Sequence, residues 1–492
     1  MEPISVHLEE NRSVVLQKIK GCADIIFRPM KLGQNVSVNC FLIYIEVATD
    51  NMMLEDSVIG KMLNHLKEQQ EEMIYQAIRE NCLGVSDVKE LKTIGEAMAA
   101  MLAGNVVMFV DHYDKALKIG SKGYPGTGVA KAESEKVLRG SKEAFSESVK
   151  VNSALIRKRI RDTSLKIKET PVGKYSNTMT AILYMEDLVY PDTLKKLEQK
   201  LDSFEIDGVM DIGIIEELTK DTWYSPFPQY QMTERPDRAA AAVMEGRVVL
   251  LSDNSPEALI LPMTFNTLFQ TSDDYYGHFT MVSFLRLIRF AAAFIAVSLP
   301  GLYLTAINYH TQLLPTNLII SLAKARRGVP FPGIVEVLFL ELSFELLREA
   351  GLRMPGPIGN TIGIVGGLII GQAAVSANIV SPVVVVIVAL TALGSFSIPN
   401  EELSGAFRLI KYIMIGLCGC FGLLGLIFGG VLLLTHLASL KSFGIPYLMP
   451  FIGKDLNKGG DRKDSVIRFP MRQMNRRPIF ARRENRIHLR MK

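Results

Sequence analysis

Charged side chains inside an apolar stretch are the residues of this sequence best placed to do chemistry. Residues 331–350 are mostly apolar but contain Glu341, Glu345, Arg348 and Glu349. At 100° per residue, these side chains fall within a sector of about 100°, which predicts an amphipathic helix with an acidic face. Such a face avoids lipid. The helix therefore lies at the interface with solvated charges, re-enters the membrane, or lines water with its polar face.

A second pattern lies in residues 358–376, where glycine recurs at every fourth position and allows close helix packing. These helix-packing candidates are Gly359, Gly363, Gly367 and Gly371. Another row of the same helix falls within about 60° on roughly the opposite side. These pore-lining candidates are Thr361, Val365, Leu368 and Gln372. A pore-lining helix would combine two such rows, although an ordinary buried helix whose Thr and Gln bond to neighbours would show them too.

The remaining polar residues show no enzyme signature. The seven histidines are scattered, and no HExxH, GxSxG or clustered Cys/His spacing occurs, so we expect no catalytic residue, metal site or cofactor. Residues 120–128, GSKGYPGTG, lack the Gly-Lys-Ser/Thr end of a phosphate-binding loop. We interpret them as a flexible connector.

The composition indicates two different environments along the chain. Of its 492 residues, 48% are hydrophobic and 22% charged, and the mean hydropathy is +0.20. Residues 1–280 carry most of the acids, whereas 281–453 contain long uncharged runs. Residues 454–492 hold 13 Lys/Arg against 4 Asp/Glu, and the rest of the chain is net negative, which argues against a nucleic-acid binder. We interpret this basic tail as a lipid-facing or disordered cytoplasmic segment that is attracted to anionic headgroups.

These patterns predict an α+β membrane protein. We expect two related α/β subdomains, 1–145 and 146–280, followed by a helical transmembrane domain over 281–453 and the basic tail. The predicted spans cover 284–306, 358–376, 379–397 and 407–438, with an amphipathic or re-entrant pair over 313–350. No signal peptide precedes residue 280. Arg286, Arg289 and the basic tail favour cytoplasmic N- and C-termini.

The two predicted subdomains share a repeated segment. Residues 97–120 and 239–262 align without a gap at an offset of 142, which pairs Gly104 with Gly246 and Asp111 with Asp253. Both copies indicate a helix end, a glycine cap, a strand, a turn and a second strand. We therefore expect matching helix–strand–strand units. A chance match across one hairpin is the alternative.

Several separated motifs also resemble those of the A-subunit family of GerA-type spore germination proteins. They are PFPQYQMTERPD (226–237), MEGRVVLL (244–251), SDDYY (272–276), RGVPFP (327–332) and IGIVGGLIIGQAAV (362–375). RGSKEAF (139–145) and NSALIRKRI (152–160) also fit, so the resemblance runs from about 35 to 453. Residues 124–145 look closer to the branch called stage V sporulation protein AF than to receptor subunits.

The resemblance implies a multi-pass protein of the spore inner membrane with cytoplasmic termini. It implies a homo-oligomer, as a pentamer, that forms an ion channel and works with other germination membrane subunits and with membrane lipid. A non-conducting scaffold subunit of a nutrient germinant receptor is the alternative. An uptake transporter would show inverted repeats among its spans, and we find none.

Overall fold

The computed structural model describes residues 2–32, 38–49, 88–124, 131–352, 369–452, 457 and 459–489. The chain forms two compact units. The N-terminal unit comprises 1–223, 230–263 and 475–492, and the helical unit comprises 224–229 and 264–474. Residues 52–82, whose apolar positions follow helical spacing, lie outside the described residues.

The first half of the N-terminal unit is an antiparallel sheet with helices α1 and α4. Its strands follow the order β1-β2-β4-β5-β3. The elements are α1 (Leu8–Ile19), β1 (Ile25–Leu32), β2 (Val38–Ile45), β3 (Val88–Leu91), α4 (Ile94–Leu102), β4 (Val106–Val110) and β5 (Ala116–Ile119). Every residue of β4, VVMFV, is buried, so this β-branched run forms the centre of the sheet.

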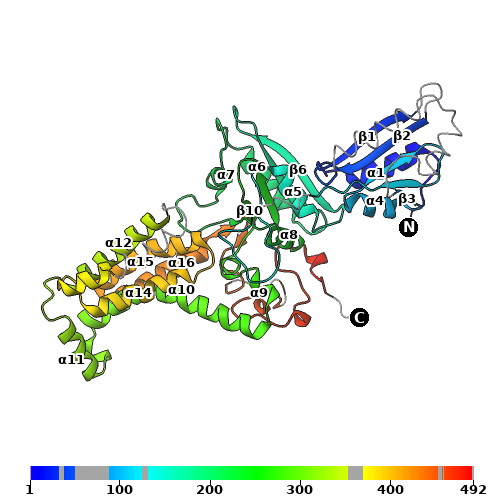
Figure 1. Ribbon diagram of the computed structural model, residues 1–492. Coiled ribbons are helices and arrows are strands. Elements are labelled where there is room, and N and C mark those ends of the chain that lie inside the picture. The colour runs from blue at the N-terminus through cyan, green and yellow to red at the C-terminus, as the bar shows by residue number, and fades with distance from the viewer. Residues whose placement is uncertain are drawn as a thin grey trace. The chain divides into compact units, whose positions relative to one another are not determined.

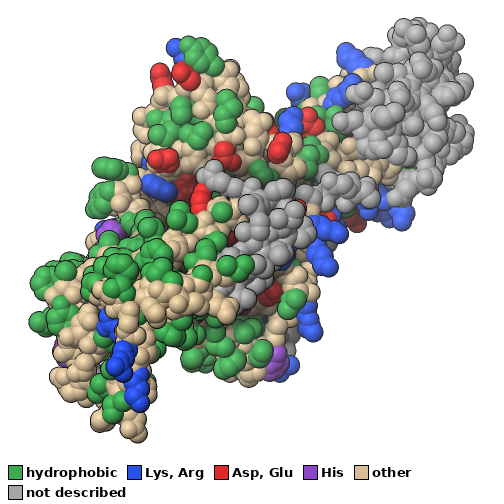
Figure 2. Space-filling view, turned by 60° about the vertical axis from the view of Figure 1, so that its left-hand side comes forward, with side chains coloured by type: hydrophobic (Ala, Val, Ile, Leu, Met, Phe, Trp, Pro, Cys, Tyr) green, Lys and Arg blue, Asp and Glu red, His purple; other side chains and the backbone are tan. Residues whose placement is uncertain are grey.

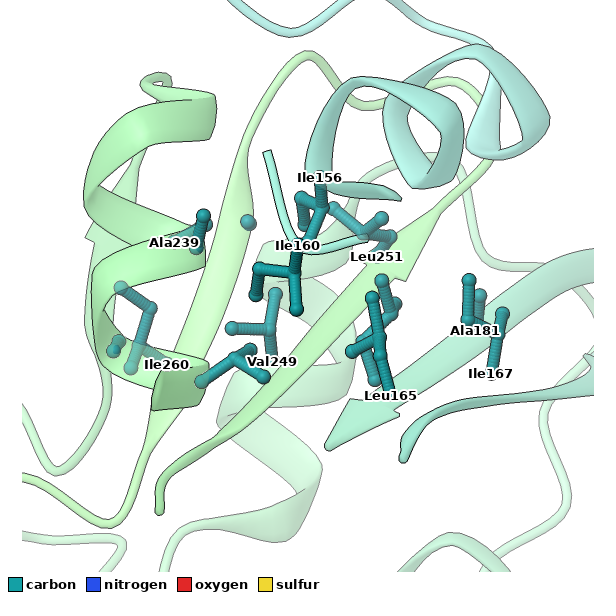
Figure 3. Close-up of a cluster of buried hydrophobic side chains, with 14 of the residues drawn as sticks. Ile156, Ile160, Leu165, Ile167, Ala181, Ala239, Val249, Leu251 and Ile260 are labelled. Carbon is teal, nitrogen blue, oxygen red and sulfur yellow. The ribbon is translucent and has the colours of Figure 1, made fainter. Parts of the chain in front are cut away.

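The second half repeats this architecture. Its strands follow the order β6-β7-β9-β10-β8. The elements are α5 (Val149–Arg157), β6 (Leu165–Val172), β7 (Thr178–Met185), α6 (Pro191–Leu201), α7 (Ile212–Thr219), β8 (Gln231–Thr233), α8 (Pro236–Met244), β9 (Val248–Ser252) and β10 (Ala258–Leu261). Figure 3 shows its core, where Ile156 and Ala239 meet strand residues such as Leu165 and Val249.

The predicted repeat is confirmed in element order and strand pairing. Val106 pairs with Ile119 in the first sheet, and Val248 pairs with Leu261 in the second, at an offset of 142 for both partners. Gly104 and Gly246 both adopt left-handed backbone conformations, with φ of +87° and +88°. These glycines end α4 and α8 at equivalent positions, as expected for helix-terminating residues.

Hydrogen bonds at the helix starts repeat as well. Asp111 Oδ1 accepts from the Leu8 N–H at 3.2 Å, and Asp253 Oδ1 accepts from the Val149 N–H at 2.7 Å. Each carboxylate follows the fourth strand of its sheet and meets the first residue of the opening helix of its own subdomain. An anion at a helix N-terminus is favourable, so one residue fixes the same helix against the same strand in both copies.

The two halves of this unit are joined by a buried ion pair. Arg157 at the end of α5 is fully buried and donates to both carboxylate oxygens of Asp24, at 2.7 and 2.9 Å. Its Nη2 also donates to the Leu165 carbonyl. A bidentate guanidinium–carboxylate pair has strict geometry, and this one therefore fixes the first subdomain to the second.

The helical unit consists of helices, most of which are apolar (Figure 1). They are α9 (Asp273–Tyr276), α10 (Phe279–Asn308), α11 (Thr316–Ala325), α12 (Gly333–Leu352), α14 (Pro382–Phe396), α15 (Glu401–Phe421) and α16 (Leu423–Ser439). Among the described residues, α10 and α15 are long and apolar enough to span a membrane, whereas α14 and α16 are shorter apolar helices. Figure 2 shows hydrophobic side chains over most of the visible surface of this unit.

The expectation of one continuous helix over 407–438 is wrong. Gly422 has φ +61° and ψ −133°, which is incompatible with an α-helix, and it separates α15 from α16. A Cβ on Gly425 would lie 2.1 Å from the Leu417 carbonyl oxygen, and one on Gly429 would lie 2.5 Å from the Met414 sulfur. As the chain advances from Gly425 to Gly429, its contacts run backwards along α15. The two helices therefore form a tightly packed antiparallel hairpin.

The basic tail is folded where it is described, which corrects the expectation of a disordered segment. Residues 475–492 belong to the N-terminal unit, and the residues before them belong to the helical unit. In the N-terminal unit, Phe480 and Ala481 are buried, and the Arg482 N–H donates to the Leu188 carbonyl at 2.9 Å. The Arg247 guanidinium lies 5.0 Å from the Phe480 ring centroid.

Gly246 tests whether the tail packs in this way. A Cβ at this position would lie 2.7 Å from the Ala481 Cα, and the residue has a positive φ. We expect Gly246→Ala to lower the free energy of unfolding by about 1–3 kcal/mol. Hydrogen exchange of the purified protein should also increase at residues 478–482.

Gly95→Ala is the matched control for this prediction. A Cβ on Gly95, which lies in α4, would meet nothing within 4 Å. Alanine favours helix, so this variant should be neutral or slightly stabilising. Equal effects of the two substitutions would contradict the packing of 480–481 against Gly246.

Candidate functional site in the apolar helices

The acidic face of α12 lies against α15 within the chain. Glu341 Oε2 lies 2.5 Å from Lys411 Nζ, and the two side chains are 2% and 7% exposed. One turn further along α12, Glu345 pairs with Arg408 of α15. The partner number falls as the α12 number rises, so the helices run antiparallel. Glu341 is therefore neutralised inside the protein, and Glu345 is neutralised in a partly exposed ion pair.

The last turns of α12 differ from this charged interface. The Arg348 guanidinium lies 5.7 Å from the ring centroid of Phe396, at the end of α14. Glu349, the third residue of the predicted acidic face, is exposed. The face thus changes from a buried ion pair at Glu341, through a partly exposed pair at Glu345, to an exposed carboxylate at Glu349.

A second buried carboxylate lies at the start of α12. Glu336 is 1% exposed, accepts from Arg326 Nη2 at 3.1 Å and accepts from the Ser381 N–H at 2.9 Å. Arg326 follows α11 and Ser381 precedes α14, so one carboxylate ties together the ends of three helices. Arg326 therefore has a local function in helix packing.

Of the glycine row and the candidate pore row, the structure describes only Gly371 and Gln372. Gly359, Gly363, Gly367, Thr361, Val365 and Leu368 lie outside the described residues. Gly371 is buried, and a Cβ there would lie 3.5 Å from Val385 of α14. Gln372 is exposed. At this one step of the helix, the glycine faces a neighbouring helix of the same chain and the amide does not.

Buried arginines mark the start of α10. Arg286 is fully buried and donates from Nε to Asp274 at 2.8 Å and from Nη1 to Asp464 at 2.7 Å. Arg289 donates to both carboxylate oxygens of Asp274, at 3.0 and 2.9 Å. The two positive and two negative charges cancel, so the first apolar helix begins at a neutral cluster, which we call the α10 anchor (Asp274, Arg286, Arg289, Asp464).

For each ion pair between α12 and α15 and in the α10 anchor, the sequence patterns identified only one of the two partners. The acidic face of α12 and the arginines of α10 were visible as charges within or beside apolar runs. Their partners Arg408, Lys411, Asp274 and Asp464 had no periodic signal. Lys411 and Arg408 lie near the start of an apolar run, where flanking charges usually face water, so burial of Lys411 depends on the tertiary contact with α12.

The described residues offer little basis for metal or substrate chemistry. Within the described ranges, no group of three or more His, Cys, Asp or Glu side chains is placed to hold a metal ion. The carboxylates of the helical unit instead meet Lys, Arg and backbone N–H groups. The arrangement can hold helices in a fixed register and keep charge inside apolar surroundings.

Fold and site together define a class of protein. A unit of paired α/β subdomains is followed by apolar helices whose surface carries exposed Phe294, Leu393 and Leu424 and whose central charges are paired internally. Exposed apolar side chains over several helices suit lipid rather than water. The class is a helical membrane protein with a folded extramembranous N-terminal unit.

The comparisons with known proteins identify the family. The family model described as Bacillus/Clostridium GerA spore germination protein matches residues 13–480. The uncharacterized membrane protein YfkQ of Bacillus subtilis (strain 168) is 39% identical over 476 residues, which covers 97% of this chain and 91% of the relative. Spore germination protein KA of the same organism is 34% identical, with 98% and 88% covered. The chain belongs to the GerA spore germination protein family.

A solved structure is similar to the N-terminal part. The N-terminal domain of the A subunit of the Bacillus megaterium spore germinant receptor GerK3 has a TM-score of 0.42 and 25% identity. The match covers 54% of this chain and 98% of that domain. Family membership confirms the resemblance to GerA-type A subunits and places the chain among non-enzymatic germination proteins of the membrane.

Lys411 provides a test of the interface between α12 and α15. Lys411→Met would leave Glu341 buried without its counter-charge, which costs about 3–5 kcal/mol of stability. Thermal unfolding of the detergent-purified protein should show this loss. The double variant Glu341→Leu/Lys411→Met should recover most of it, because a matched apolar pair needs no counter-charge.

Lys441→Met is the control for the Lys411 variant. Lys441 is exposed in the short strand after α16. Its substitution should change stability by no more than about 0.5 kcal/mol. A Lys411→Met variant as stable as this control would show that Glu341 does not need Lys411.

The α10 anchor should make the stability of the protein depend on pH. Burial alone would raise the pKa of Asp274, but hydrogen bonds and positive charge from Arg289 and Arg286 outweigh it and lower the pKa below its ordinary value. Ionised Asp274 therefore stabilises the fold at pH above about 4, and this stabilisation is lost as pH falls through the lowered pKa. Asp274→Asn should lower the unfolding temperature most at neutral pH and progressively less at acidic pH.

The control for this titration is Asp114→Asn. Asp114 is exposed in the N-terminal unit. This variant should track the parent protein across the whole pH range. A difference between parent and Asp274→Asn that stays constant down to pH 3 would show that the charge of Asp274 is not what stabilises the anchor.

Proposed function

We propose that this chain is a subunit of an oligomeric ion channel of the spore inner membrane, which releases ions to trigger or amplify germination. The observation that carries the proposal is the division at residues 371 and 372. Gly371 packs against α14 of its own chain, whereas Gln372 is exposed. An amide exposed on an apolar helix needs water or another subunit. A ring of subunits around a water-filled axis supplies both.

Helix geometry extends this argument along the row. Thr361, Val365 and Leu368 fall within about 40° of Gln372 around an ideal helix. Hydroxyl and amide groups replace part of an ion's hydration, whereas rings of Val or Leu close a pore by dewetting. The row thus supplies both a path and a closed state.

The paired charges of the other helices support a pore that lacks fixed charge. Glu341, Glu345 and Glu336 are each matched by a cation inside the chain. They stabilise helix packing and do not need to meet the permeating ion. In the proposal, the conducting surface is the uncharged row on the helix that ends at residue 376.

Topology and assembly are part of the same proposal. Arg286 and Arg289 at the start of α10 favour a cytoplasmic N-terminal unit. A pentamer with cytoplasmic termini follows from the family resemblance, as does assembly with other germination membrane subunits. The segment 124–145 suggests the stage V sporulation protein AF branch, which the set of membrane proteins that co-purifies with the chain would check.

Leu368→Ser tests conduction. A small polar residue should wet the constriction, so potassium-loaded liposomes containing the purified variant should leak several-fold faster than liposomes with the parent protein. Val365→Ser should act in the same direction. Spores that carry either change should germinate early or lose ions during formation.

A matched control separates the row from general membrane damage. Leu432→Ser makes the same substitution at a half-exposed position of α16, and it should leave ion flux unchanged. Assembly is checked on a native gel. If Leu368→Ser assembles normally and passes no more ions than the parent protein, the row serves packing, and the chain acts as a non-conducting scaffold subunit of a germinant receptor complex.

A further inference from the structure

A segment of the tail is fixed along the first turns of α10. Ser283 Oγ donates to the Arg468 carbonyl at 3.0 Å, and the Arg468 N–H donates back to Ser283 Oγ at 3.0 Å. Arg286 Nη1 contacts the Asp464 carboxylate and the Ser465 carbonyl at 2.7 and 3.0 Å. The Tyr275 hydroxyl also donates to Asp464. Residues 464–468 are therefore held in place beside the helix, as the red segment near α9 in Figure 1 shows.

Apolar side chains of both elements are exposed. On α10, Met281, Phe284, Leu285 and Ile288 follow the i, i+3, i+4, i+7 spacing of one helix face, and each is at least 38% exposed. In the tail segment, Ile467, Phe469 and Met471 are exposed as well. Larger exposed apolar patches that are rimmed by polar residues mark sites of contact with proteins or membranes.

Positive charge accompanies these side chains. Arg462 and Arg472 are exposed and Lys463 is half-buried. Asp464 is already neutralised in the α10 anchor, which leaves Arg462, Lys463, Arg468 and Arg472 against Asp461 within 461–474. Apolar side chains interleaved with Arg are the composition that binds the headgroup region of an anionic membrane.

The length of α10 places residues 464–468 at the level of the lipid headgroups. The helix has 30 residues, or about 45 Å at 1.5 Å per residue. The hydrocarbon core is about 30 Å thick, so about ten residues of α10 extend beyond it. Arg286 and Arg289 place that excess at the N-terminal end, and this end is where residues 464–468 are attached.

We propose that residues 462–472, held against the first turns of α10, form a surface that binds anionic phospholipid. The phosphate groups lie on Arg462 and Arg472, and Phe469 and Met471 enter the boundary between headgroups and acyl chains. The α10 anchor holds the segment in position. This surface requires only that the chain is a membrane protein, and it is independent of ion conduction.

The single tryptophan makes a direct test possible. Trp223 is replaced by Phe, and a reporter is introduced as Met471→Trp in the full-length chain. The protein is reconstituted into vesicles of phosphatidylcholine that contain a brominated lipid, either phosphatidylcholine or phosphatidylglycerol. Bromine quenches tryptophan only at contact. We expect quenching by both lipids and at least a two-fold stronger effect of phosphatidylglycerol at equal mole fraction.

Charge variants identify the source of the preference. Arg462→Gln/Arg472→Gln in the reporter protein should bring the quenching ratio of the two lipids close to one. The matched control Lys195→Gln/Arg483→Gln removes two exposed cations from the N-terminal unit and should keep the preference of the parent protein. A ratio unchanged by Arg462→Gln/Arg472→Gln would overturn headgroup recognition.

A second reporter, Phe284→Trp, controls for depth. It lies on the exposed face of α10 and should be quenched by both lipids. Quenching at residue 284 without quenching at residue 471 would show that the tail segment does not reach the bilayer. Absence of quenching at both positions would place the whole surface in water. Either result overturns the proposal.

Discussion

An unpaired charge cannot remain in an apolar helical unit, and this constraint determines which helices are neighbours. A carboxylate such as Glu341 loses several kcal/mol of hydration on burial and requires a counter-charge with good geometry. Lys411 supplies it from α15, and Arg408 supplies the next one for Glu345. Because the two pairs are spaced along both helices, they determine register and direction as well as proximity. Helix α12 could not pack with its acidic face toward lipid.

The same constraint explains the α10 anchor. Arg286 and Arg289 would need water or phosphate if α10 began alone at the membrane surface. Asp274 comes from the helix just before α10, and Asp464 comes from the chain nearly 180 residues later. The anchor therefore links the beginning and the end of the helical unit. Arg286 and Arg289, which by sequence indicate only membrane topology, therefore also hold distant parts of the helical unit together.

The sequence predicted the parts of the fold that depend on local pattern. The repeat was visible because Gly104 and Gly246 both need positive φ after a helix, and because Asp111 and Asp253 follow equivalent strands. The break at Gly422 was missed, since a glycine within an apolar run gives no sign that the helix ends there. The folding of the tail was missed because its basic composition hides the buried Phe480 and Ala481.

The candidate site follows the same division between local and tertiary information. One face of a helix can be read from periodicity, so the acidic face of α12 was found in advance. Most of the row that includes Gln372 lies outside the described residues and stays a prediction. The surroundings of such a face depend on helices distant in sequence. Within the described residues, Glu341 is paired with Lys411 inside the chain, whereas Gln372 is exposed. A polar group exposed on an apolar helix needs water or a second molecule, and in the proposed channel Gln372 meets both at the axis of the assembly.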